Sequence, residues 1–154
     1  MTYVVRGLDP APYGELFGLP DDALAARGVV RMAVTDPTFP CRVSLTDRAI
    51  GEQVLLLNHV SHDVANPYRA SHAIFVTEGA DAAAEYVDQV PSVFDLRVLS
   101  LRGFDADGMM AEAILTQPGE ADAGIRRLFA NPEIETIHAH NATRGCFAAR
   151  IERN

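Results

Sequence analysis

Short apolar segments separated by Gly, Pro, Asn and Asp dominate the pattern of hydrophobic and polar positions along the chain. Alternation of apolar with polar residues indicates a half-buried strand, and a short continuous apolar run indicates a buried one. Segments of these two kinds occupy residues 3–8, 29–35, 41–45, 52–59, 72–76, 97–104, 109–116, 134–140 and 146–151. Allowing for short or irregular segments among them, the pattern predicts about seven strands.

Helical patterns are fewer and shorter. Residues 20–28 begin with a proline and two aspartates and end with a glycine, as short helices do. Residues 120–130 place three apolar side chains on one face, and residues 80–87 also favour a helix. Most consecutive strands are joined by links of hairpin length, such as residues 105–108. We therefore predict an α+β fold, a single compact domain over residues 1–154 with a mostly antiparallel sheet.

Charge excludes several classes of partner and mechanism. The 154 residues carry 21 Asp and Glu against 13 basic residues, for a net charge of -8. Nucleic acids and anionic membranes select a basic surface, so we expect neither as a partner. All 13 basic residues are Arg, and the lack of Lys excludes a lysine Schiff base and a P-loop lysine.

The amino-terminal residues lack the pattern of a signal peptide, and no apolar run approaches the roughly 20 residues of a membrane helix. We therefore expect a cytoplasmic protein in which Cys41 and Cys146 are reduced thiols. The expected partners are a small molecule and, as the commonest oligomer, a second copy of the chain in a homodimer.

Five histidines fall in two short segments, and the sharpest feature is His138-Ala139-His140. On a strand, both imidazoles project from one face about 7 Å apart, where they can converge on one ion or anion. This face should point to solvent or to a polar cavity. A metal site needs a third ligand, which His59 or His62 would supply. The residues after the pair, 141–144, lack the Glu that usually follows it in cupin-like sites, so a metal-free pocket or simple polar histidines are the alternatives.

Residues 66–72 place Tyr68, Arg69 and Ser71 on an irregular stretch between two apolar strands, and such loops concentrate binding groups. Arg69 can clamp a carboxylate or phosphate through its planar fork, or it can simply pair with one of the acids.

The two cysteines each have an arginine nearby, Arg42 beside Cys41 and Arg144 two residues before Cys146. Cationic neighbours favour the nucleophilic thiolate, and a Cys–His pair can perform covalent catalysis. The alternative is a buried, inert thiol at each position.

Several blocks of the chain resemble the bacterial family known as domain of unknown function 1203. They are Phe39–Leu45, Val54–Asn58, Pro67–Ser71, Phe104–Met110, His138–Asn141 and Gly145–Arg150. The resemblance spans nearly the whole chain, and it implies a small stand-alone protein but no activity. The blocks contain the polar groups singled out above, as a shared pocket would. Phe147 stands where the family pattern would have Tyr, so no phenol is expected to act there.

The leading hypothesis is therefore a site for an anionic small molecule, with catalysis left open. Its acid, base and nucleophile would be His138, His140 and Cys146, and its ligand-binding groups would be Arg69, Tyr68, Ser71, Arg42, Asn141 and Arg144. The alternatives are a non-catalytic interaction module acting as a homodimer, and a metalloprotein using His138, His140 and His59. No cofactor other than such a transition metal is expected.

Overall fold

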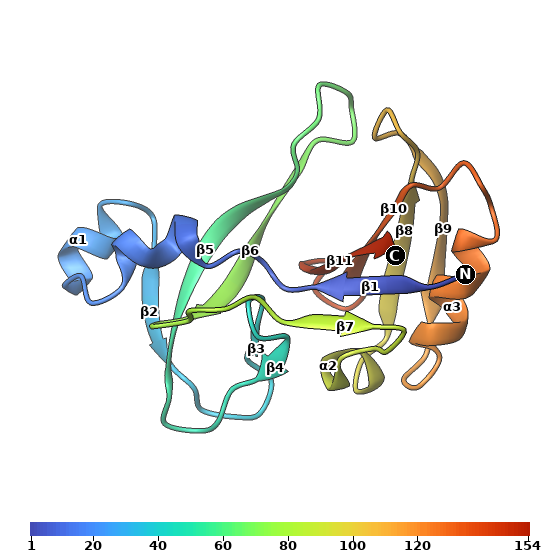
Figure 1. The fold of residues 1–154 in the computed structure, drawn as a ribbon. Coiled ribbons are helices and arrows are strands. Elements are labelled where there is room, and N and C mark those ends of the chain that lie inside the picture. The colour runs from blue at the N-terminus through green and yellow to red at the C-terminus, as the bar shows by residue number, and fades with distance from the viewer.

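The computed structural model describes residues 1–154, which form eleven strands in two sheets with four short helical segments. Figure 1 shows the sheets side by side, with the two chain ends close together. A hydrogen bond from the Asn154 N–H to the Thr2 carbonyl, 3.1 Å, joins these ends. The predicted α+β class is confirmed. None of the helices is long and apolar enough to cross a bilayer.

The first sheet has six antiparallel strands. In spatial order they are β7 (Glu85–Val87), β1 (Tyr3–Arg6), β11 (Phe147–Arg153), β10 (Thr136–Asn141), β8 (Leu99–Phe104) and β9 (Met110–Thr116). One face packs on α3 (Ala121–Phe129) and α2 (Ser92–Asp95) around a core of 17 buried residues. Side chains along each strand point alternately to the two faces of the sheet, so the face opposite this core can carry polar side chains.

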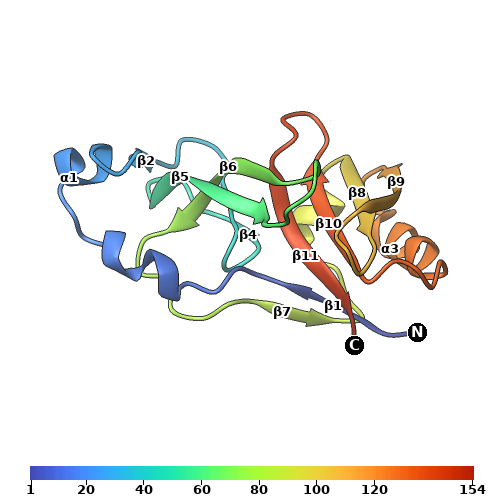
Figure 2. The ribbon, with the colours of Figure 1, turned by 90° about the horizontal axis from the view of Figure 1, so that it is seen from above.

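The second sheet has five strands. In spatial order they are β2 (Val30–Ala33), β5 (Gln53–His62), β6 (Ala70–Thr77), β3 (Pro40–Cys41) and β4 (Thr46–Asp47), and only β3 and β6 pair in parallel. A smaller core of nine buried residues lies beneath it, with contributions from η1 (Ala11–Leu16) and α1 (Asp21–Ala25). The two cores lie one beyond the other in space, so the molecule is elongated from α1 to α3, as Figure 2 shows.

The long β5–β6 hairpin reaches from the second sheet toward the polar face of the first (Figure 1). Its tip is attached to the β8–β9 turn, where Asn66 Nδ2 donates to the Asp107 carbonyl at 3.0 Å. Gly108 in that turn has a φ of 74°, and a Cβ added there would lie 2.7 Å from Val64. Glycine is therefore required for the hairpin tip to approach so closely.

The turn at residues 42–45 holds the two sheets together through backbone contacts. The Gly7 N–H donates to the Ala84 carbonyl, the Ala84 N–H to the Val43 carbonyl and the Leu8 N–H to the Arg42 carbonyl, each at 2.8 Å. A Cβ on Gly7 would lie 2.0 Å from the Val43 carbonyl oxygen, so this approach also requires glycine. The arrangement fixes the position of the Arg42 backbone.

The structure has eleven strands in two sheets, where about seven in one mostly antiparallel sheet were predicted, and two segments were assigned wrongly. Residues 41–45 were predicted as a strand, but only Cys41 lies in one, at the end of β3; residues 42–45 form a tight turn, in which Leu45 adopts a φ of 55°. Their apolar side chains are buried because the turn faces both cores, and alternation alone does not distinguish that from a strand. Residues 80–87 contain no helix, since residues 85–87 pair with β1 as an edge strand. Neither η1 nor α2 was predicted.

Candidate functional site

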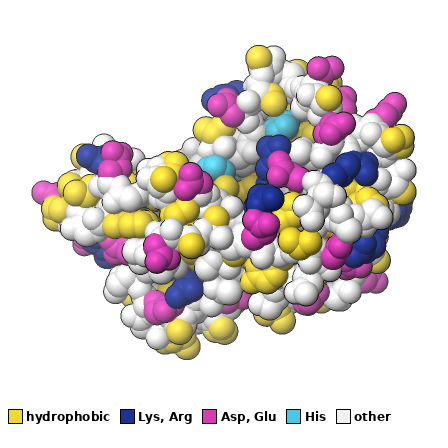
Figure 3. Space-filling model, in the orientation of Figure 1, with side chains coloured by type: hydrophobic (Ala, Val, Ile, Leu, Met, Phe, Trp, Pro, Cys, Tyr) yellow, Lys and Arg dark blue, Asp and Glu magenta, His cyan; other side chains and the backbone are white.

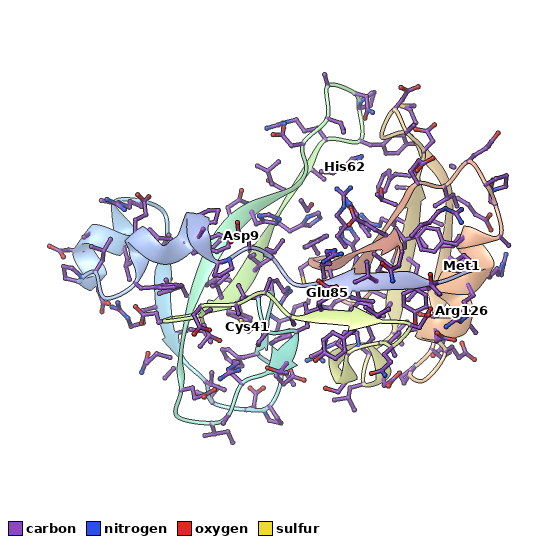
Figure 4. The ribbon with its side chains drawn as sticks, viewed as in Figure 1. Met1, Asp9, Cys41, His62, Glu85 and Arg126 are labelled. Atoms are coloured by element: carbon purple, nitrogen blue, oxygen red, sulfur yellow. The ribbon has the colours of Figure 1, made fainter.

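All five histidines gather where the β5–β6 hairpin meets the first sheet. The ring centroids of His62 and His138 are 5.1 Å apart, those of His72 and His140 4.9 Å, and those of His138 and His140 6.4 Å. In Figure 4, His62 lies on the hairpin side of this junction, facing the first sheet. We call this group, with Phe104 and Phe147 packed against it, the histidine cluster.

His138 and His140 project from the same face of β10, as the period of a strand predicts. That face, however, opens to neither solvent nor a wide cavity. His138 is 1% exposed and His140 2% exposed, because the hairpin covers them. The pair therefore belongs to the interior between the sheets.

Four histidines each have a hydrogen-bond partner on one ring nitrogen. His62 Nε2 lies 2.8 Å from the Gly108 carbonyl and His140 Nδ1 3.0 Å from the Gly145 carbonyl, so each of these nitrogens carries the proton. His59 and His72 contact the hydroxyls of Tyr13 and Ser61, respectively, through Nδ1 at 3.2 and 2.9 Å. These hydrogen bonds fix the orientation of the four imidazole rings.

His138 is different because neither of its ring nitrogens has a protein partner. Burial lowers its pKa to about 3, and the neighbouring charges of His62, Arg150, His140 and Arg102 act in the same direction. Burial also lowers the pKa of His140 to about 4, although the bond to the Gly145 carbonyl opposes the shift. Both imidazoles are therefore neutral near pH 7.

The surroundings of the cluster do not favour a bound cation. Arg102 and Arg150 stand directly beside His138 on the two flanking strands. No three His, Cys, Asp or Glu side chains of the chain are arranged to hold a metal ion, so His59, His138 and His140 do not form a preformed ligand set.

A groove of about 900 Å³ runs past the cluster between the hairpin and the first sheet. Figure 3 shows a hollow between the two halves of the molecule, with histidine at its margin and both signs of charge along it. Its charged lining residues are Asp63, Asp105, Asp107, Glu135, Glu152, Arg150 and Arg153. The five carboxylates outnumber the two arginines, so the groove is acidic and does not favour an anionic ligand.

A second pocket, of about 400 Å³, has a very different lining. It lies between the 42–45 turn, the segment before β8 and the β10–β11 turn, and we call it the arginine pocket. Its residues are Thr38, Pro40, Arg42, Phe75, Leu96, Arg97, Val98, Asn141, Ala142, Thr143, Arg144 and Cys146. None is acidic, although the chain has 21 Asp and Glu.

Arg42 is the central group of this pocket. Its side chain is buried, with the residue only 3% exposed, and burial lowers the pKa of the guanidinium. It donates to the Phe147 and Pro40 carbonyls and to Cys146 Sγ, and none of these contacts is a carboxylate. Arginine nevertheless stays charged in proteins. Arg42 is therefore a buried cation whose charge has no carboxylate beside it.

The other two arginines differ in their charge balance. Arg97 is paired with Asp47, with nitrogen–oxygen distances of 2.6 and 3.0 Å, so its charge is neutralised. Arg144 is exposed at the mouth of the pocket and makes no ion pair with Asp or Glu. The uncompensated charges of the pocket are thus those of Arg42 and Arg144.

Cys146 lies in the wall beside Arg42. Its Sγ accepts hydrogen bonds from Arg42 Nη2 at 3.2 Å and from Asn141 Nδ2 at 3.3 Å. The β10–β11 hairpin positions both Asn141 and Cys146, since the Asn141 N–H donates to the Cys146 carbonyl at 2.9 Å.

The structure divides the residues predicted for one site into three groups. Arg42, Asn141, Arg144 and Cys146 line the arginine pocket together. His138 and His140 lie in the histidine cluster instead.

The hairpin residues form the third group. Arg69 is exposed and pairs with Asp63, Ser71 is exposed, and Tyr68 contacts only the rim of the cluster through Phe104, at 6.3 Å between ring centroids. These three residues are not part of the lining of the arginine pocket.

Sequence reasoning did not identify Arg97, Arg102 or Phe104 as site residues. Each lies on or beside β8, whose alternating pattern was interpreted only as half of a hairpin. Arg102 and Phe104 lie on the same face of β8, opposite His138 and Thr136 of β10. This shared face was the only signal in the sequence that could have identified them.

Comparison with known proteins places both sites within one family. A protein-family model described as "Protein of unknown function (DUF1203)" matches residues 38–153, about three quarters of the chain. A search of curated proteins and a search of solved structures each found no match. The matched range contains the arginine pocket and all five histidines, and the resemblance seen in the sequence is confirmed. The chain belongs to the DUF1203 family.

Proposed function

We propose that the protein binds a small anionic molecule in the arginine pocket. The observation that carries this proposal is the absence of any acidic side chain among twelve lining residues that include three arginines. In a chain of net charge -8, such a lining gives a local positive region on an otherwise negative protein.

The energetics of Arg42 support an anionic ligand. A buried charge is costly unless it is paired, and carbonyl dipoles compensate only part of that cost. An anion in the pocket would supply the missing counter-charge. A guanidinium also presents donors in a planar fork that suits carboxylate and phosphate groups.

The pocket also provides groups that would orient a ligand. Thr38 and Thr143 offer hydroxyls, while Phe75 and Leu96 offer apolar surface. A volume of about 400 Å³ lies within the range of small-molecule sites. The lining therefore suits a metabolite with one or two acidic groups and a short apolar portion.

Isothermal titration calorimetry with inorganic phosphate, sulfate and succinate tests the proposal. We expect saturable binding of at least one of them at one site, weakened by added salt. Arg144→Gln removes an exposed charge without disturbing the core, and we expect it to weaken binding about three- to tenfold. Arg69→Gln is the matched control, an exposed arginine outside the pocket, and should bind as the wild type does.

Two results would overturn the proposal. One is that none of the three anions binds at millimolar concentration. The other is that Arg69→Gln weakens binding while Arg144→Gln does not, because the anion would then sit at the hairpin tip.

A further inference from the structure

The Cys146 sulfur is contacted only by hydrogen-bond donors. Both of its side-chain contacts, Arg42 Nη2 and Asn141 Nδ2, can only donate hydrogen bonds. A cation beside a cysteine sulfur is typical of the surroundings of a reactive cysteine. Since Arg42 has no carboxylate partner, the sulfur is the one contact that can balance its charge.

The pocket around this sulfur limits the chemistry that it can do. Its lining contains no His, Asp or Glu, so no side chain there can relay a proton to or from a substrate. His140 is near in sequence, but its Nδ1 bonds to the Gly145 carbonyl and its ring packs in the histidine cluster. Transfer of an acyl group from an amide or ester to the sulfur would require such a donor to protonate the departing amine or alcohol. Attack of a thiolate on a disulfide requires none.

We propose that Cys146 exchanges with small disulfides that carry carboxylate groups, forming a reversible mixed disulfide in the arginine pocket. The inference rests on the proposed function, because the same arginine pocket, with the uncompensated charge of Arg144 at its mouth, would hold a carboxylate of the incoming disulfide.

The exchange step is balanced without an added oxidant. The Cys146 thiolate attacks one sulfur of the disulfide, a new S–S bond forms and the old one breaks. The second sulfur leaves as a thiolate, which takes a proton from water. Excess small thiol reverses the step by attacking the mixed disulfide.

Cys41 is the internal control for this assignment. It is fully buried, and its sulfur accepts the Thr77 N–H at 3.3 Å rather than a cationic donor. A disulfide reagent therefore cannot reach it in the folded protein. The two thiols of the chain differ in access and in whether a cationic donor contacts the sulfur, so one reagent distinguishes them.

The experiment is a charge series of disulfides followed by intact-mass spectrometry of the full chain. Oxidised glutathione is anionic, hydroxyethyl disulfide is neutral and cystamine is cationic. We expect one adduct on the wild type and on Cys41→Ser, and none on Cys146→Ser. The anionic reagent should react about tenfold faster than the cationic one at low salt, and the difference should shrink at high salt.

Arg144→Gln supplies the test of the charge assignment. It should slow the reaction with oxidised glutathione several-fold and leave hydroxyethyl disulfide nearly unchanged. An adduct on Cys41, equal rates for the three reagents, or a Cys146 no faster than the same cysteine in urea-unfolded protein would overturn the inference. Calorimetry on Cys146→Ser separates the two proposals, because anion binding that persists there leaves the proposed function standing when exchange fails.

Discussion

Acid should unfold this protein through its buried histidines, and the size of the effect can be worked from the structure. The folded-state pKa of His138 is about 3 and that of His140 about 4, while an unfolded chain has about 6.5. Between these limits the unfolded state binds more protons than the folded state. The stability contributed is therefore complete above pH 6.5 and is lost as the pH falls toward 4 and 3.

Each pH unit in this window costs about 1.4 kcal/mol per histidine. Between pH 6.5 and pH 5 the loss is about 2 kcal/mol for each of the two, or about 4 kcal/mol together, before any coupling between them. A domain of this size has a total stability of about 5–15 kcal/mol. Preferential protonation of these two histidines in the unfolded state should thus remove a large share of the free energy of unfolding in mildly acidic buffer.

The perturbation that isolates the effect is His138→Leu. Leucine has a similar volume and no ring nitrogens to leave unpartnered, so the cluster should stay packed. Urea unfolding at pH 7.5, 6.0 and 5.0 should show a loss of about 2 kcal/mol across the window instead of about 4. The matched control on the same strand, Ile137→Val, should lower stability by about 1 kcal/mol equally at every pH. The reasoning is refuted if His138→Leu declines with pH as steeply as the wild type.

Two further substitutions test the packing that supports the sites. Gly7→Ala should destabilise the protein by about 2 kcal/mol or more in thermal or urea unfolding, because its Cβ would meet the Val43 carbonyl at 2.0 Å. Gly14→Ala, where a Cβ would meet nothing within 4 Å, is its control, and equal effects would show that the close approach is absent. Tyr3→Phe removes the 2.6 Å bond to Asp122 and should cost about 1 kcal/mol, measured by urea unfolding. No loss would mean that the bond contributes nothing net.

Local patterns predicted those parts of the fold that local sequence determines. The hairpin formed by β8 and β9, the amphipathic helix α3 and the final pair of strands all appear where alternation and turn residues place them. The turn at residues 42–45 was mistaken for a strand because its apolar side chains are buried by neighbours from distant parts of the chain. Burial of this kind is decided by tertiary packing, which a short window of sequence does not contain.

The residues of the candidate sites show the same difference between what local sequence determines and what tertiary packing determines. Asn141, Arg144 and Cys146 lie within six residues, so one hairpin brings them together. The hairpin-tip residue Arg69 was assigned to the same pocket, but the β5–β6 hairpin leans toward the β8–β9 turn and leaves it exposed beside Asp63. The direction in which a long hairpin leans depends on contacts at its tip, and no periodicity encodes it.

Arg42 connects the two sites physically. Its charge lowers the pKa of His59, His72 and His140, although burial is the larger cause for each. The same guanidinium forms the wall of the arginine pocket and contacts Cys146. An anion or a thiolate next to Arg42 would offset part of the positive potential at these imidazoles. The backbone of Arg42 is held in place by the Leu8 N–H and by the adjoining contacts among Gly7, Ala84 and Val43. The pocket that is proposed to bind anions and the histidine cluster that resists protonation therefore both depend on this one buried arginine.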